Sequence, residues 1–448
     1  MLPVEKAREY AQFLVERAQA AGADAADAVY IGSESQSVQV RFGELEHVDR
    51  SEGEEMGLRV FVGQQSASVA SSDFSNEALD ELVGRAIAMA REAPEDSYAG
   101  LAPAELLASG PFPDVESEGR SADNPEALRG RALAAERAAL AVTGVTNSSG
   151  GSAGTSASTM ALATSTGFSG ASRSTGHSCS VSVVAGEGAT MQRDSAWHGS
   201  RHLEDLDAPE QIGRLAGDRA VSKLNPQKPR AGRYPILFDP RVAGSILTHF
   251  AAAISGGAVA RKASFLLDKL GEQIFADGIR IVDDPLRLRG LRSRQFDGEG
   301  LPVRRTDLVS EGILRTWTAE SASARQLGIQ PTGHAVRGAS GAPGAGPSNL
   351  FIEVGSRSRD DLFAAFPEAI LVTELIGQGI NYVTGDYSRG AAGFMIRNGE
   401  IAEPVAEITI ASNLLDMFVT LEPASDLEFR RGIDSPTLLI PEMTVAAA

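Results

Sequence analysis

Apolar residues recur at three- and four-residue steps in several stretches of the chain, and this spacing predicts amphipathic helices. In the first stretch Val4, Ala7, Ala11 and Leu14 share one face, and Gly22 marks the end. Helices are predicted over residues 3–21, 77–92 and 125–142, and a fourth starts at Asp207-Ala208-Pro209-Glu210, where Asp207 is the expected N-cap.

The stretch from Arg233 to Asp284 organises the rest of the chain. A short apolar strand at 234–238 precedes a helix that begins at Asp239-Pro240, because an aspartate before a proline supplies a cap oxygen and a preset φ. Gly256-Gly257 interrupts the pattern, and a second helical segment, 262–275, leads into a strand at 279–282. The apolar face of the first helix holds Val242, Ile246, His249, Phe250 and Ala253.

Alternating or short apolar runs predict strands on both sides of these helices. The acidic run 52–55 is expected to be a solvated loop, and the polar run 147–152 a wide turn, with a flexible linker as its alternative. Asn398-Gly399 between apolar runs indicates a hairpin, and Ser412 is the expected cap of a short helix. The predicted strands include 28–31, 37–42, 58–62, 67–70 and 437–440, and 160–166 is expected to pair with 179–185.

Strands and helices mixed without regular alternation predict an α+β, multidomain fold. We expect an N-terminal α/β domain at 1–110, a central domain of strands and helices at 111–228, and a strand-rich C-terminal domain at 229–448. The order strand, turn, strand, polar bend, helix occurs between Leu58 and Glu92 and again between Val181 and Leu224. An internal duplication and a chance similarity of pattern both remain open.

Composition narrows the class of protein. The 448 residues are 42% hydrophobic and 22% charged, as in ordinary globular proteins. The formal charge of −18 argues against direct binding to nucleic acid, which relies on clustered lysine and arginine. The single cysteine, Cys179, suits a reducing cytoplasm. No apolar run approaches the roughly 20 residues that cross a bilayer, so we expect a cytoplasmic protein without a membrane segment.

The organising helix lacks the residues of a helix-borne metallohydrolase site. Such a site needs two imidazoles on one face and a carboxylate beside the first as general base. Residues 247–253 contain one histidine, His249, and no glutamate. We interpret His249 as a core or boundary histidine. The glycine-rich stretch Gly333–Gly346, with His334 and Arg337, lacks the spacing of a dinucleotide loop, so we expect a mobile loop.

Two further pairs of residues, one His-Cys and one His-His, are weak candidates for metal binding. His177 and Cys179 would share one face of a strand, whereas His198 and His202 are separated by a Gly-Ser that disfavours a helix. Neither pair has an evident third ligand. The sequence His202-Leu203-Glu204 matches only part of the zinc-deaminase pattern, since one cysteine cannot provide its Cys-x-x-Cys.

Four short motifs give the chain a resemblance to a known family. They are Gly57-Leu58-Arg59-Val60-Phe61 with Ser71–Ser75, Asn147-Ser148-Ser149-Gly150, Arg261-Lys262-Ala263-Ser264-Phe265, and Gly393 to Ile401. Together they resemble the PmbA/TldE branch of the TldD/PmbA family, long described as modulators of DNA gyrase. The resemblance implies a cytosolic metallopeptidase assembly in which a TldD subunit and its PmbA/TldE relative act on unfolded peptides.

The resemblance also locates the residues that depart from the catalytic branch. There the helix before the Arg-Lys pair carries His-Glu-x-x-x-His, and a cysteine near the C-terminus completes the zinc site. The matching positions here hold Thr248, His249 and Ala253, counted back from Arg261, and residues 427–441 contain no cysteine. We therefore expect no catalytic residue, no metal ligand and no cofactor in this chain, with zinc in a TldD-like partner.

Two hypotheses about function follow. The first is a non-catalytic subunit of a TldD-like metallopeptidase that degrades or processes unfolded peptides as a heterodimer. Thr248, His249, Ala253 and Arg261 are then candidates for lining the peptide channel. The alternative is an autonomous peptidase or hydrolase with an unrecognised site, acting as a homodimer.

Overall fold

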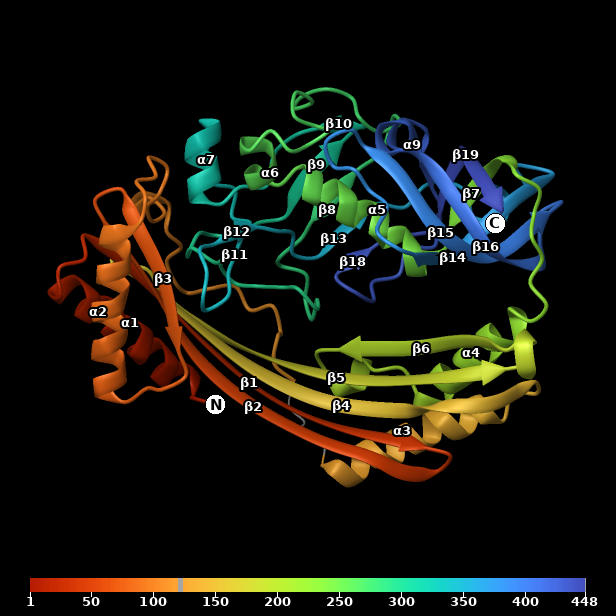
Figure 1. Cartoon of the computed structure of the whole chain (residues 1–448), viewed down its shortest axis with the longest axis horizontal. Coiled ribbons are helices and arrows are strands. Elements are labelled where there is room, and N and C mark those ends of the chain that lie inside the picture. The colour runs from red at the N-terminus through yellow and green to blue at the C-terminus, as the bar shows by residue number, and fades with distance from the viewer. Residues whose placement is uncertain (120–123, 448) are drawn as a thin grey trace.

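The N-terminal half of the chain is built around one long, curved sheet (Figure 1). The computed structural model describes residues 1–119 and 124–447. The sheet has the order β3-β2-β1-β4-β5-β6, and all neighbouring strands are antiparallel. Its strands are β1 (Ala25–Arg41), β2 (Glu44–Val62), β3 (Gln65–Ser71), β4 (Val145–Thr164), β5 (Ser169–Ala185) and β6 (Gln192–Ser200). The β1–β4 pairing therefore joins strands from the two parts of the chain expected at 1–110 and 111–228.

Each half of this sheet comes from a unit with the order helix, three strands, helix. The first unit has α1 (Val4–Ala20) and α2 (Asn76–Glu92), and the second has α3 (Pro125–Leu140) and α4 (Pro209–Ser222). The strand order is symmetric about the β1–β4 pair, so the third strand of each unit lies at an outer edge. The repeated pattern in the sequence thus corresponds to equivalent parts of a repeated unit.

The four helices cover one face of the sheet, and the C-terminal half of the chain covers part of the other. Side chains alternate between the faces of a strand. Tyr30 packs with α1 and α2, and Val38, eight residues along the same strand, packs with α3. Val29 points to the opposite face, where it meets Phe296 and Ala339. This second face is the contact between the two halves of the molecule.

Two runs predicted as connections are parts of strands. Glu52–Glu55 lies within β2 and pairs with β1 between the part of the sheet covered by α1 and α2 and the part covered by α3, and its acidic side chains are mostly exposed. The amino group of Met1 lies 2.8 Å from Glu52 and offsets part of this charge. The run 147–152 lies within β4, where small residues are needed because a Cβ on Gly151 would meet the carbonyl oxygen of Ala132 in α3 at 2.5 Å. Both loop predictions were wrong.

The remaining helix starts were predicted nearly correctly. The cap position of α4 is Ala208, without a side-chain bond, because the Asp207 carboxylate instead contacts Arg430 at 2.6 Å. The short helix α9 (Leu414–Thr420) is capped by Asn413, one residue after the expected Ser412. At α4 the predicted cap is thus engaged in an ion pair, and at α9 the neighbouring Asn413 side chain makes the capping hydrogen bond expected of Ser412.

The C-terminal half contains two main sheets, and the larger of the two closes on itself (Figure 1). The order is β16-β15-β14-β7-β19-β17, and β16 also pairs with β19. Its strands are β7 (Gly232–Phe238), β14 (Glu368–Ile376), β15 (Asp386–Arg397), β16 (Glu400–Asn413), β17 (Glu422–Pro423) and β19 (Leu438–Ala447). The predicted hairpin is confirmed between β15 and β16, where Asn398 and Gly399 have φ of 51° and 86°.

A smaller sheet and several short helices complete this half. The sheet has the order β10-β9-β8-β13-β18. Its strands are β8 (Ile281–Asp283), β9 (Thr306–Ser310), β10 (Ile313–Leu314), β13 (Leu350–Ile352) and β18 (Ile433–Asp434), and a separate hairpin joins β11 (Ala335–Val336) to β12 (Gly344–Ala345). The helices are α5 (Pro240–Ala253), α6 (Gly256–Ala260), α7 (Ser321–Leu327) and α8 (Arg359–Phe363), and the short 3₁₀ turns are η1 (Ala104–Leu106), η2 (Gly188–Thr190) and η3 (Leu203–Asp205).

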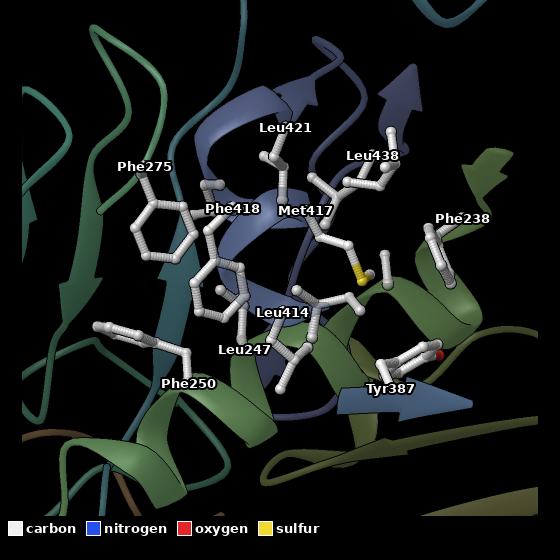
Figure 2. Packing of buried hydrophobic residues seen from close by; sticks show 14 of the residues in the cluster. Phe238, Leu247, Phe250, Phe275, Tyr387, Leu414, Met417, Phe418, Leu421 and Leu438 are labelled. Carbon is white, nitrogen blue, oxygen red and sulfur yellow. The ribbon is translucent and has the colours of Figure 1, made fainter. Parts of the chain in front are cut away.

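Helix α5 is the central element of the C-terminal core. Asp239 caps it as predicted, accepting a hydrogen bond from the backbone of Arg241. Figure 2 shows Phe250 of α5 beside Phe275 and Phe418, whose rings stack at 4.4 Å between centroids. The expected second helical segment, 262–275, is not helical, because Lys262 adopts a positive φ of 56° and the chain turns away from the helix axis. The α+β fold is confirmed.

The contact between the two halves leaves no room at Gly57 of β2. A Cβ on this residue would lie 1.8 Å from the carbonyl oxygen of Ala339. We therefore expect Gly57→Ala to lower the free energy of unfolding by about 1–3 kcal/mol, the usual cost of overpacking. Gly53→Ala, on the same strand with no atom within 4 Å, is the matched control. Urea unfolding that gives equal losses for both variants would contradict the close contact.

Candidate functional site

The four residues selected from the sequence lie along α5 and just beyond α6. Thr248 is exposed, and its hydroxyl donates to the carbonyl oxygen of Gly244 at 3.0 Å. His249 is 4% exposed, and Ala253 is fully buried in the core. Arg261 is exposed immediately after α6. The accessible part of this site thus consists of Thr248 and Arg261, and His249 lies beneath it.

His249 is held by aromatic side chains from the β14–β15 connection and from β15. Its Nδ1 lies 2.9 Å from the hydroxyl of Tyr382, and the ring of Tyr387 lies edge-on to it with centroids 6.1 Å apart. Its Nε2 is buried and has no hydrogen-bond partner among residues 1–119 and 124–447. Within the described residues the imidazole is therefore anchored through one nitrogen, and the other is buried without a hydrogen-bond partner.

The surroundings keep this imidazole neutral at pH 7. Burial, followed by the positive charge of Arg389 on β15, lowers the pKa of His249 to about 4. Burial also raises the pKa of the Tyr387 phenol, so that group stays protonated. A neutral imidazole with so low a pKa is a weak general base at pH 7, because efficient acid–base catalysis needs a pKa near the operating pH.

The donor set around His249 does not fit a zinc ion. Zinc sites use at least three nitrogen, sulfur or oxygen ligands. The positions that carry ligands in the catalytic branch hold Thr248 and Ala253 beside His249, and neither of these replaces an imidazole or a carboxylate. No cluster of three His, Cys, Asp or Glu side chains suited to a metal occurs in the described part of the chain. We therefore derive no metal-dependent step for this chain.

The two candidate pairs, His177 with Cys179 and His198 with His202, occupy structural positions. His177 and Cys179 are both buried on the same side of β5, and burial raises the pKa of the Cys179 thiol to about 11. His198 lies on β6, where its Nδ1 accepts a hydrogen bond from the backbone of Asp207. His202 follows that strand, with Nε2 lying 2.8 Å from the carbonyl oxygen of Glu116. The helix that would align His198 with His202 is absent, as the Gly-Ser between them indicated.

The glycine-rich stretch 333–346 is anchored at its start, which corrects the expectation of a mobile loop. His334 is 2% exposed, and its Nε2 lies 3.4 Å from Asp283. The Arg337 guanidinium is buried and bonds to Asp27 of β1 at 2.6 Å. The stretch forms the β11–β12 hairpin and fastens the C-terminal half to the N-terminal sheet. Glycine content alone could not reveal these contacts.

Sequence reasoning missed the partners of His249. Tyr382 is 133 positions away along the chain. Tyr387 and Arg389 are two residues apart on β15, so they lie on one face of that strand. This two-residue spacing was the one sign in the sequence that Tyr387 and Arg389 act together. No sequence pattern indicated that their strand packs against α5.

Acid titration tests the buried state of His249. Its folded pKa of about 4 lies below the ordinary 6.5, so the unfolded chain takes up this proton first as the pH falls. The stability that comes from keeping His249 neutral is fully present above pH 6.5. The free energy of unfolding then falls by about 2–3 kcal/mol as the pH drops to 4. We expect His249→Gln to flatten the pH dependence of unfolding across this window, while His47→Gln, at an exposed histidine, leaves it unchanged. Parallel profiles for the native chain and His249→Gln would show that His249 is not desolvated.

Comparison with known proteins covers nearly the whole chain. Descriptions of the PmbA/TldA metallopeptidase match in three consecutive parts, domain 1 at residues 26–90, the central domain at 118–224 and the C-terminal domain at 231–447. The metalloprotease PmbA of Escherichia coli O157:H7 is 39% identical over 412 residues, which cover 92% of this chain and 89% of that protein. The PmbA homolog of Haemophilus influenzae is 37% identical over 445 residues, 99% and 96% of the two chains.

Solved structures show the same architecture. A candidate modulator of DNA gyrase from Bacteroides thetaiotaomicron superposes with a TM-score of 0.92 at 26% identity, covering 100% of both chains. TldE from Thermococcus kodakarensis superposes with a TM-score of 0.85 at 20% identity, covering 97% of this chain and 99% of that one, and shows the fold alone. These likenesses confirm the resemblance read from the four motifs, and the chain belongs to the PmbA/TldD family.

Proposed function

We propose that this chain is the non-catalytic, PmbA/TldE-type subunit of a TldD-like cytoplasmic metallopeptidase that degrades or processes unfolded peptides. The observation that carries the proposal is the environment of His249. The relatives are named metalloproteases, yet here the single imidazole on α5 is buried against Tyr382 and Tyr387, and no cluster of three metal ligands occurs among the described residues. Peptide hydrolysis needs an activated water, and a buried imidazole of low pKa is poorly suited to activate one.

The surface above His249 supports a role in shaping a peptide channel. Thr248 and Ala252 are exposed on α5, and Arg261 is exposed just beyond α6. Small side chains on a helix leave space for a peptide backbone, and an extended peptide held through its backbone is bound with broad specificity. A TldD-like partner of the same fold would place its own helix opposite this one across a pseudo-symmetric interface. The competing arrangement, a homodimer acting alone, lacks a catalytic group at the same position.

Within the described residues, no helix has the length and apolar character needed to cross a bilayer. The net charge of −18 also disfavours direct contact with nucleic acid. Both properties agree with a partner that is a protein and a ligand that is a peptide.

Metal analysis tests the proposal directly. We expect the purified chain to retain far less than one zinc per molecule after dialysis, because α5 offers only His249 and three ligands are needed. The metal content is measured by mass spectrometry for the native chain and for His249→Ala. A stoichiometric zinc that is lost in the variant would overturn the non-catalytic assignment and favour the autonomous enzyme.

A further inference from the structure

An arginine-lined cavity of about 300 Å³ lies where the N-terminal sheet meets the C-terminal half. Most of its lining comes from three segments distant in sequence: residues 198–205 at and after the end of β6, the loop at 287–291 and the segment 429–434, which contains β18. The five arginines in its lining are Arg201, Arg287, Arg289, Arg430 and Arg431. Only two aspartates, Asp205 and Asp434, share the lining, so the cavity is locally positive in a chain whose net charge is −18.

Two of the five arginines are neutralised within the protein. Arg289 pairs with Glu116 at 2.7 Å, and Arg430 pairs with Asp207 at 2.6 Å. Asp434 is also engaged, since its carboxylate accepts hydrogen bonds from three successive backbone N–H groups at 430–432. These contacts fix the walls of the cavity. The other three guanidinium groups belong to Arg201, Arg287 and Arg431.

Arg201 is partly buried, and it has no carboxylate partner in the described part of the chain. It donates to the carbonyl oxygen of Thr175 at 3.2 Å and to that of Leu291, and its Nε has no hydrogen-bond partner there. Burial lowers the pKa of this guanidinium. A partly buried cation that bonds only to neutral carbonyls keeps its full charge uncompensated, which favours an anion beside it.

Arg287 and Arg431 are likewise bound through rings and carbonyls. The Arg287 guanidinium lies 3.4 Å from the centroid of the Phe429 ring, and no ion pair to it occurs within 1–119 and 124–447. Arg431 donates to the carbonyl oxygen of Arg241 at 2.6 Å and lies over the ring of Trp197 at 5.4 Å, again without an ion pair in those ranges. Stacking positions each planar group while leaving N–H donors for an anion.

We propose that this cavity binds a small phosphate-bearing molecule, with the phosphoryl group held by Arg201 and Arg287 and with Arg431, which also lines the neighbouring cavity beside Trp197, completing the positive wall. A phosphate monoester carries close to two negative charges and three acceptor oxygens at neutral pH, which suits three guanidinium groups better than one carboxylate does. The cavity volume exceeds that of a phosphate ion, and Leu288 and Phe429 supply apolar surface for the rest of the molecule. The site is separate from His249, so it is a second binding site beside the proposed peptide channel.

Calorimetric titration of the full chain with inorganic phosphate and with pyrophosphate, at constant ionic strength, tests the proposal. We expect saturable 1:1 binding that weakens about tenfold in Arg287→Gln and in Arg431→Gln, the usual effect of losing one charge-assisted hydrogen bond. Arg305→Gln, which removes an exposed arginine outside the cavity, is expected to bind as the native chain does. Thermal melts establish that each variant is folded.

Three results would overturn the phosphate site. The first is the absence of saturable binding of either probe. The second is an equal loss of affinity in Arg287→Gln, Arg431→Gln and Arg305→Gln, which would reflect net charge alone. The third is tighter binding of citrate than of pyrophosphate, which would assign the cavity to carboxylates.

Discussion

Replacing Asp27 by alanine is expected to lower the free energy of unfolding by about 3–5 kcal/mol, because two buried guanidinium groups lose the carboxylate with which both form ion pairs. Asp27 lies on β1 and is 1% exposed. Arg59 of β2 donates to it through Nε at 3.0 Å, and Arg337 of the β11–β12 hairpin donates at 2.6 Å. The substitution therefore breaks one buried polar contact between the two halves and removes the carboxylate that compensates the Arg59 and Arg337 charges.

Asp27, Arg59 and Arg337, here called the triad, also predict that the stability of the fold depends on pH in the acid range. Burial alone would raise the pKa of Asp27, but Arg59 and then Arg337 outweigh it and hold that pKa below its ordinary 3.8. The stabilisation is therefore complete above about pH 4 and is lost as the pH falls through the folded pKa. Asp27→Ala should remove this step from the acid-unfolding profile.

Urea unfolding at pH 7 measures the loss, with Glu442→Gln as the matched control. Glu442 forms an ion pair with Arg233, but both side chains are largely exposed. Exposed pairs contribute about 0–1 kcal/mol, so this variant should stay close to the native chain. Similar losses in Asp27→Ala and Glu442→Gln would show that the triad is not a buried interaction.

The sequence predicted helices better than strands, for physical reasons visible in particular elements. Helices α1 and α5 carry their signals locally, as an apolar face with a stop at Gly22 or a start at Asp239-Pro240. The strands β2 and β4 run through Glu52–Glu55 and 147–152, which look like loops. The extended form of Glu52–Glu55 depends on pairing with β1, and that of 147–152 depends mainly on pairing with β5. Pairing between segments that lie well apart in the sequence leaves no local pattern.

The candidate site was predictable only in part. The lone His249, without a second ligand on its helix, could be read directly from the chain and led to the non-catalytic interpretation. Its contacts with Tyr382 and Tyr387 depend on how β15 packs against α5, which the sequence does not encode locally. Arg337 was seen within a glycine-rich stretch, but its partner Asp27 is 310 positions away.

The second large effect concerns peptide cleavage. If the chain is the proposed non-catalytic subunit, it should cleave a flexible peptide at least about a thousandfold more slowly than the assembly with a TldD-like partner, because a subunit without a water-activating group forgoes several kcal/mol of barrier lowering. Together with that partner it should support cleavage. Ala252→Trp, which fills the exposed side of α5, should reduce the activity of the assembly, while Ala20→Trp at the exposed end of α1 should not. Equal effects of the two tryptophans would remove α5 from the peptide channel.

The most direct measurement compares the cleavage of one fluorogenic, unstructured peptide by this chain, by the TldD-like partner and by both together, each with and without a chelator. The proposed function predicts no cleavage by this chain, full cleavage only by the pair, and loss of that cleavage in chelator. Cleavage by this chain alone that persists in chelator, or full activity of the partner without it, would contradict the account.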